Sequence, residues 1–150
     1  MKAKQKRKVT GPKQSKLDLI GDIPQFFRLN VEVGDLQSAI SFYTSLMGIE
    51  GRKQAGSRCY FECGPVTLQV LDVSSERQPH PAPKALYFTV NNLEEVYERA
   101  KSLKCLSAKD VHEGSGGGIA VRPWGERSFY VQDPWKNPLC FVEEGTVYIG

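Results

Sequence analysis

The feature that most constrains the fold of this chain is an internal repeat with an offset of 57 residues. In the first copy, a strand-like segment at residues 26–33 leads directly into a segment with helical periodicity at residues 35–48. The same order returns at residues 84–90 and 92–104. In both copies, apolar residues alternate along the strand and then recur on one face of the helix. A register that continues from strand through turn to helix favours a true duplication over a chance match of two amphipathic segments.

Capping residues and further strand-like segments complete the repeat. Asp35 and Gly48 have the positions of helix caps, and Asn92 with Glu95 has the spacing of a capping box. The further strands are expected at residues 50–54, 58–62 and 66–73 in the first copy, and at 107–111, 127–132 and 138–143 in the second. The sequence therefore predicts an α+β fold of two βαβββ modules. The expected boundaries are a basic, disordered tail at 1–24 and one domain at 25–146, with module one at 26–73, a proline-containing linker at 74–83 and module two at 84–144.

Charge and composition exclude several classes of protein. Residues 1–24 carry a net charge of +5, and residues 25–150 carry −2. The basic segment could touch nucleic acid through phosphates, but it has no aromatic residue for base stacking, so a solvated tail and no nucleic-acid partner are expected. No apolar run approaches the ~20 residues that span a bilayer, and no secretory signal is visible, so we expect a cytoplasmic protein without a membrane partner. The four cysteines do not form a disulfide framework.

The order of elements resembles that of a known superfamily. Two βαβββ modules, the opening "VGDLQSAISFYTSLMG" and the late "DP" turn followed by a strand are similar to the vicinal oxygen chelate superfamily over about residues 26–144. This superfamily includes glyoxalase I, extradiol dioxygenases and bleomycin-resistance proteins. The resemblance implies that each module curls into a half-barrel with its helix outside, and that paired modules enclose a ligand cup.

Strand alternation predicts which side chains face this cup. If Leu29, Val31 and Val33 pack against a helix, the residues between them point to the opposite, concave face. The residues expected to line the cup, together with two tryptophans in neighbouring loops, are Arg28, Asn30, Glu32, Gln69, Tyr87, Trp124, Trp135 and Cys140.

The resemblance also implies where a metal would bind. Metal-dependent members take His or Glu ligands from four strand positions, which here are Arg28, Gln69, Ala85 and Cys140. None of these is a histidine or a carboxylate, whereas a catalytic site usually needs three protein ligands. We therefore expect no metal and no cofactor, with Glu32 as the one cup-facing carboxylate that could serve a rearranged site. Cys140 is expected to be a small wall residue, because no histidine is near it in sequence to activate it.

The segment "PWGERSFYVQDPWKNPLCFVEE" looks most like the C-terminal part of bleomycin-resistance proteins. Those proteins sequester a drug in the clefts of a homodimer without using a metal. The resemblance implies a metal-free homodimeric binder of a small organic molecule, with a role in antibiotic resistance as one possibility. Arg28 in the cup disfavours an unpaired cation and suits an anionic or neutral aromatic ligand equally. The alternative is a glyoxalase- or dioxygenase-like metalloenzyme, a lyase or an oxidoreductase, with rearranged ligands.

Overall fold

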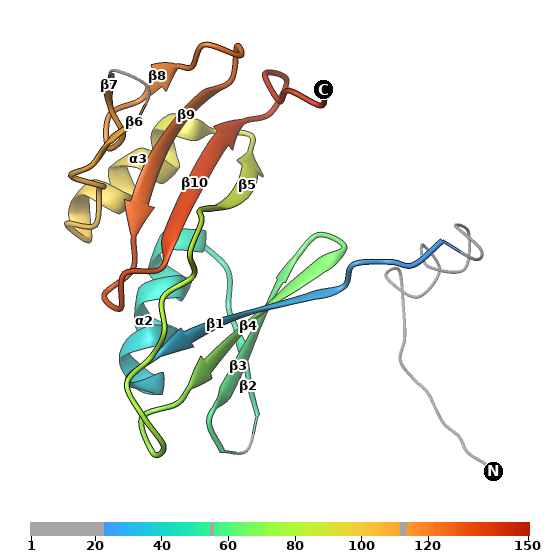
Figure 1. Cartoon of the computed structure of the whole chain (residues 1–150), viewed down its shortest axis with the longest axis vertical. Helices are drawn as coiled ribbons and strands as arrows, with labels where there is room; N and C mark the ends of the chain where they lie inside the picture. The colour runs from blue at the N-terminus through green and yellow to red at the C-terminus, as the bar shows by residue number, and fades with distance from the viewer. Residues whose placement is uncertain (1–22, 55, 112–113) are drawn as a thin grey trace.

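A computed structural model describes residues 23–54, 56–111 and 114–150 (Figure 1). The predicted α+β fold of two βαβββ modules is confirmed. Module one contains β1 (Arg28–Val33), α2 (Leu36–Met47), β2 (Arg52–Gln54), β3 (Arg58–Cys63) and β4 (Val66–Asp72). Module two contains β5 (Leu86–Val90), α3 (Leu93–Ser102), β6 (Asp110–Val111), β7 (Gly114–Ser115), β8 (Ala120–Val121), β9 (Arg127–Gln132) and β10 (Pro138–Glu143). The expected tail lies outside the described residues except for its last two positions.

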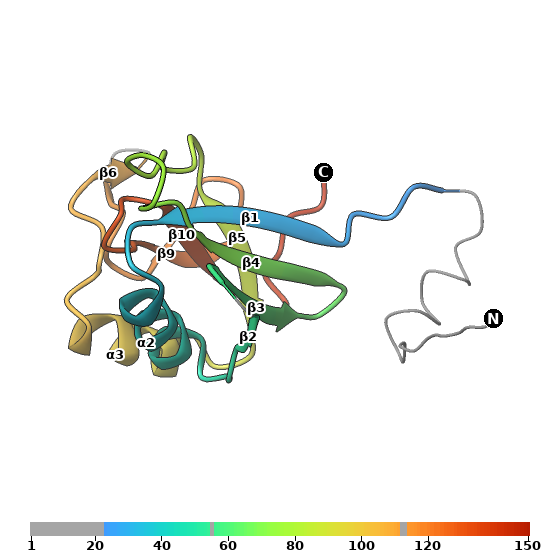
Figure 2. The same ribbon diagram turned by 90° about the horizontal axis from the view of Figure 1, so that it is seen from below.

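Each module forms a mixed four-stranded sheet with its helix packed on one face. The strand orders are β1-β4-β3-β2 and β5-β10-β9-β8, and the first strand of each module pairs in parallel with the last. The helix α2 contacts β3 and β4, and α3 contacts β9 and β10. The two helices also contact each other and lie side by side in Figure 2. Among the described residues, β1 and β2 are the edge strands of the first sheet, and β5 and β8 are those of the second.

The helix ends follow the capping residues of the sequence. The side chain of Asp35 accepts a hydrogen bond from the Ser38 backbone N–H, and Gly48 ends α2 with a left-handed φ of 73°. The side chain of Asn92 accepts from the Glu95 N–H at the start of α3. These contacts satisfy helix-end groups that would otherwise have no partner.

Of the strand expected at residues 107–111, only Asp110–Val111 forms one, β6, and it does not belong to the second four-stranded sheet. The fourth strand of the second sheet is β8, which pairs with β9, while β6 and β7 form a separate short hairpin. The glycine-rich stretch explains the difference, because the backbone packs against residues that precede β6. A Cβ atom on Gly116 would lie 2.6 Å from the Lys109 carbonyl oxygen, and one on Gly117 would lie 2.4 Å from that of Ser107. Only glycine allows this close approach.

One hydrophobic core joins the two modules. Buried side chains from both helices and both sheets form a single cluster that includes Leu46, Phe61, Leu93 and Phe129. No helix within the described ranges is long and apolar enough to span a bilayer.

A buried polar network also crosses the module boundary. Tyr43 on α2 donates its hydroxyl proton to Asp133 Oδ2 over 2.7 Å. The side-chain amide of Asn137 donates to the same Asp133 oxygen at 2.8 Å and to the Glu32 carbonyl oxygen at 2.9 Å, and its Oδ1 accepts from the Ala82 N–H at 2.8 Å. Asp133 and Asn137 are almost fully buried. The turn between β9 and β10 is thereby tied to α2, β1 and the linker.

Candidate functional site

The face of the first sheet that the sequence predicts to be concave is polar. Val31 and Val33 on β1 are buried in the core, whereas Arg28 and Asn30 are exposed on the other face. Arg28 pairs in register with Thr67 on β4, and Asn30 pairs with Gln69. The strand alternation expected from the sequence is therefore present in module one.

The side chain of Gln69 lies at the centre of this face and is incompletely bonded. It is only 6% exposed, although it is on the polar face. Its Nε2 donates to Asn30 Oδ1 at 3.0 Å, and its Oε1 has no hydrogen-bond partner among the residues that the structure describes. A buried polar atom without a partner is uncommon in native folds and indicates a place where another group can bind.

Aromatic and cationic side chains surround Gln69. Tyr60 on β3 pairs in register with Gln69 and with Arg52 on β2. The guanidinium carbons of Arg28 and Arg52 lie 5.7 Å and 5.6 Å from the centre of the Tyr60 ring. Both distances are within the range of a cation–π contact.

Glu32 is engaged by the linker between the modules. Its two carboxylate oxygens each accept a hydrogen bond of 2.6 Å from Arg77, and one also accepts from the His80 backbone N–H at 2.8 Å. These bonds lower the pKa of Glu32 to about 2. Glu32 therefore remains ionised and is neutralised by Arg77, so a metal would have to displace a bidentate ion pair to reach it.

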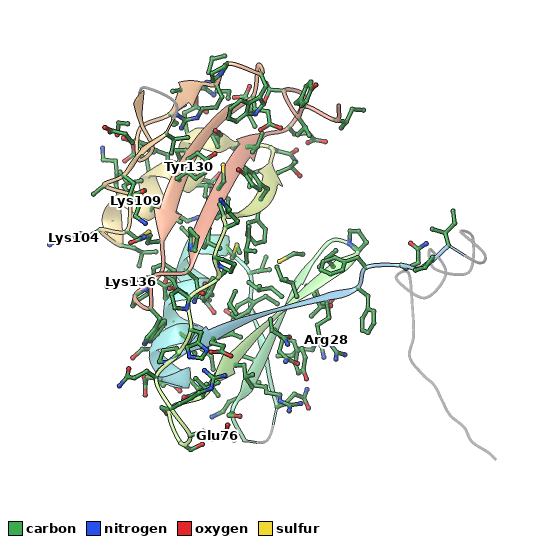
Figure 3. The ribbon with its side chains drawn as sticks, in the orientation of Figure 1. Arg28, Glu76, Lys104, Lys109, Tyr130 and Lys136 are labelled. Atoms are coloured by element: carbon green, nitrogen blue, oxygen red, sulfur yellow. The ribbon has the colours of Figure 1, made fainter. Side chains whose placement is uncertain are left out.

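The second sheet carries the other expected cup residues. Tyr87 on β5 pairs in register with Cys140 on β10, and Cys140 pairs with Tyr130 on β9. The two phenol oxygens of Tyr87 and Tyr130 are 3.3 Å apart. Arg28 and Tyr130, labelled in Figure 3, mark the two sheets. The structure therefore divides the expected site residues into two groups on separate sheets.

Cys140 is enclosed by its neighbours. It is 0% exposed, and burial raises the pKa of its thiol to about 11. A thiol of this kind is almost entirely protonated at neutral pH and is a poor nucleophile and a poor metal ligand.

Arg122 lies on the same face of the second sheet as Tyr130, and the sequence pattern did not predict it as a site residue. It follows β8, is 4% exposed, and donates from Nε and Nη2 to the Ser128 hydroxyl and carbonyl oxygens, each at 3.0 Å. Its guanidinium carbon lies 5.3 Å from the centre of the Tyr130 ring. The sequence places Arg122 beside a glycine-rich stretch, and only the pairing of β8 with β9 turns it toward Tyr130.

A hollow of about 450 Å³ lies over one end of this face. Tyr87, Trp124 and Tyr148 contribute aromatic side chains to it, and Glu126 contributes a carboxylate. Glu126 accepts a hydrogen bond of 2.8 Å from the Trp124 indole N–H and one of 2.9 Å from the Tyr148 backbone N–H. This carboxylate therefore holds the Trp124 side chain and the Tyr148 backbone in place, and Tyr87 itself is 60% exposed. The volume falls within the range of small-molecule sites.

Trp135 lies elsewhere, at the contact between the modules. It packs against the shared core, and a Cβ atom on Gly34 would come within 2.8 Å of its indole nitrogen. Its backbone N–H donates to Asp133 Oδ1 at 2.8 Å, so it belongs to the buried network around Asn137. Of the two tryptophans expected near a ligand, Trp124 borders the hollow, whereas Trp135 packs against the core and joins the buried polar network.

A larger and more apolar cleft of about 740 Å³ lies between the modules. It is bounded by Phe26 and Leu29 on one side and by Leu86 and Phe88 on the other. Phe26 is 65% exposed. This cleft gives the chain an exposed apolar surface next to the open edges of β1 and β5.

The donor set does not resemble a metal centre. The four positions named from the resemblance carry a guanidinium, an amide, a methyl group and a protonated thiol, at Arg28, Gln69, Ala85 and Cys140. Within residues 23–54, 56–111 and 114–150, no group of three or more histidine, cysteine, aspartate or glutamate side chains is placed to hold a metal ion. The residues present therefore do not fit a catalytic divalent metal.

Solved structures with the same fold come from several bacteria. A glyoxalase-related enzyme from Fulvimarina pelagi is 18% identical with a TM-score of 0.65, and the alignment covers 85% of this chain and 94% of that one. Lactoylglutathione lyase from Agrobacterium tumefaciens is 23% identical with a TM-score of 0.58, covering 82% and 96%. A bleomycin-binding protein complexed with bleomycin is 16% identical with a TM-score of 0.59, covering 81% and 99%. No curated protein matches the sequence.

A family model identifies the superfamily of the chain. The profile of the Glyoxalase/Bleomycin resistance protein/Dioxygenase superfamily matches residues 25–141, which is most of the chain and includes both modules. The chain therefore belongs to the Glyoxalase/Bleomycin resistance protein/Dioxygenase superfamily.

Proposed function

We propose that this protein binds a small organic molecule, without a catalytic metal, on the concave faces of its two sheets. The proposal rests on one combined observation. The protein has a hollow lined by aromatic side chains, and the side chains at the four metal-ligand positions of the family are not metal ligands. Tyr87, Trp124 and Tyr148 offer flat apolar surfaces of the kind that hold aromatic ligands. Arg28, Asn30, Gln69 and Cys140 supply polar groups on the two faces without a histidine or a carboxylate among them.

The proposed assembly is a homodimer. Open strand edges are a liability that proteins usually cover, and here β1 and β5 are both unpaired on one side. The apolar cleft between the modules and the exposed side chains of Phe26 and Tyr87 add surface that a twofold partner would bury. A concave face of one copy could then be completed by its partner, as in a drug-sequestering protein of the bleomycin-resistance type.

Tryptophan fluorescence tests the binding site directly. The anionic aromatic dye 8-anilinonaphthalene-1-sulfonate serves as the probe, and Trp124 is the expected donor of energy transfer to the bound dye. The Trp124→Ala variant should weaken dye binding by about 1–3 kcal/mol, because a wall of the hollow is lost. Its loss of stability should stay below the about 3–5 kcal/mol typical of a fully buried tryptophan. The matched control is Trp135→Phe, which should leave dye affinity unchanged.

Two results would overturn the proposal. The first is dye binding that is absent from the native protein, or that Trp124→Ala leaves unchanged. The second is one bound zinc, nickel, manganese or iron per chain in protein purified without chelators, because it would favour the metalloenzyme alternative. Sedimentation velocity tests the dimer separately.

A further inference from the structure

Three arginines lie on the concave face of the first sheet. The register pairs Arg28 with Thr67, Arg52 with Tyr60, and Arg58 with Leu71, so the three guanidinium groups share the face that carries Gln69. All three arginines are exposed. Arg28 comes from β1, on one side of β4, whereas Arg58 and Arg52 come from β3 and β2, on its other side. The three arginines therefore span the sheet and do not line one edge.

The acidic groups of this face neutralise only part of its charge. Arg52 forms an ion pair with Glu62 at 2.5 Å, and Glu32 is occupied by Arg77. No ion pair to Arg28 or Arg58 is found within the part of the chain that the structure describes. Two guanidinium groups are therefore available to an anion on a face that is cationic overall.

Tyr60 restricts the guanidinium groups on either side of it. Arg28 and Arg52 both contact its ring, and Arg28 also lies 4.9 Å from the centre of the Phe27 ring. A guanidinium held over aromatic rings keeps its N–H edge exposed, and that edge matches the two oxygens of a carboxylate. Less side-chain entropy is then lost when the anion binds.

Gln69 adds a requirement for a hydrogen-bonding group. Its amide donates to Asn30 Oδ1, and exchanging oxygen and nitrogen in both amides would reverse this bond and leave the Gln69 nitrogen as the atom without a partner. In the arrangement observed, the unpaired atom is an acceptor, so it calls for a donor such as a hydroxyl. Arg28 and Gln69 are diagonal neighbours on β1 and β4, with Cα atoms about 8 Å apart from strand geometry.

We propose that this face binds a small organic anion whose carboxylate is held by Arg28 and whose hydroxyl donates to Gln69 Oε1. A flat ring between the two groups would lie beside Tyr60. The inference rests on the proposed function, because it names the chemical class of the molecule that the protein binds. It assigns Tyr60, Arg52 and Arg58 to the site in addition to Arg28 and Gln69, with Arg58 acting through its charge.

Three matched probes test the two contacts separately. They are 3-hydroxybenzoate, benzoate without the hydroxyl, and 3-hydroxybenzamide without the charge, each titrated into ¹⁵N-labelled full-length protein. We expect 3-hydroxybenzoate to shift backbone amide signals of β1, β3 and β4. It should bind about tenfold more tightly than 3-hydroxybenzamide, since a hydrogen bond to a charged group is worth about this factor, and about fivefold more tightly than benzoate, since the hydroxyl makes a weaker, neutral hydrogen bond.

Matched variants locate the contacts. Arg28→Ala should weaken 3-hydroxybenzoate about tenfold and leave 3-hydroxybenzamide unchanged. Lys53→Ala is the control, because Lys53 is exposed on β2 beside Arg52 but belongs to the opposite face. It should change affinity by less than about twofold, since a separate surface charge acts only through screened attraction. Gln69→Leu should abolish the difference between 3-hydroxybenzoate and benzoate while leaving benzoate itself unchanged.

The outcomes separate this inference from the proposed function. Equal affinity for 3-hydroxybenzoate and 3-hydroxybenzamide on this face would overturn the anion assignment and leave the binding function standing. Equal effects of Arg28→Ala and Lys53→Ala would also overturn it, because the effect would then reflect net charge. If the face instead docks an acidic surface of a second copy, Arg28→Ala will convert a dimer to a monomer and none of the probes will bind, which likewise overturns it.

Discussion

Asn137 offers the sharpest test of how the two modules are held together. Its side chain makes three hydrogen bonds, to the Glu32 carbonyl oxygen, to Asp133 Oδ2 and from the Ala82 N–H, and it is 0% exposed. Replacing it with alanine removes all three and leaves buried groups from β1, the linker and the β9–β10 turn without partners. Two neutral bonds and one to a carboxylate together contribute about 3–5 kcal/mol.

This loss is a large fraction of the whole stability of a domain, which is about 5–15 kcal/mol. Urea denaturation followed by circular dichroism should therefore show a markedly lower midpoint for Asn137→Ala. Asn91→Ala is the matched control, because Asn91 is exposed at the end of β5, and its free energy of unfolding should change by less than about 0.5 kcal/mol. Hydrogen exchange at the Ala82 amide gives a local measurement and should accelerate in Asn137→Ala. A loss below about 1 kcal/mol, with Ala82 still protected, would refute the assignment of this network as the link between the modules.

Two further predictions concern buried ionisable groups. With its pKa raised to about 11, the Cys140 thiol should have about 300-fold less thiolate at pH 7.5 than an ordinary cysteine. Iodoacetamide should therefore label half-buried Cys63 well before Cys140. Equal labelling rates would contradict the burial of Cys140. Burial, together with the Asp133 charge and hydrogen bond, holds the pKa of Tyr43 well above its usual value. As the pH rises past about 10, the unfolded chain therefore loses this proton before the folded protein does. The free energy of unfolding should then fall by about 1.4 kcal/mol per pH unit. Urea denaturation should show that Tyr43→Phe is less stable than the native protein at pH 8. The difference between their free energies of unfolding should shrink by about 1.4 kcal/mol by pH 11. A difference that stays constant would argue against the Tyr43–Asp133 bond.

Local patterns were sufficient to predict most of the fold. The ends of α2 follow from Asp35 and Gly48, because capping depends on residues within a few positions of the helix end. The strands β9 and β10 match their expected bounds, since alternation and the turn between them are local signals. The strand expected at 107–111 failed because apolar alternation does not report the close backbone contacts that Gly116 and Gly117 allow.

The candidate site was predictable only one strand at a time. Alternation along β1 predicted that Arg28 and Asn30 point away from the core, and the register with β4 places Gln69 beside Asn30. The contact of Tyr60 with two arginines depends on the order of the strands in the sheet, and no local pattern contains that order. The bond between Tyr43 and Asp133 joins residues that are 90 positions apart. Such contacts are decided by tertiary packing.

The bond between Tyr43 and Asp133 also bears on the history of the repeat. Tyr43 lies in module one and Asp133 in module two, and the offset of 57 residues places Ala100, which is also fully buried, where Tyr43 would have its counterpart. The network therefore exists once and connects unlike partners. In a separated module one, Tyr43 would lose its acceptor, whereas Asp133 in module two would keep the donors of Trp135 and Asn137. The two copies are no longer interchangeable, because a duplicate of module one would lack Asp133 and a duplicate of module two would lack Tyr43.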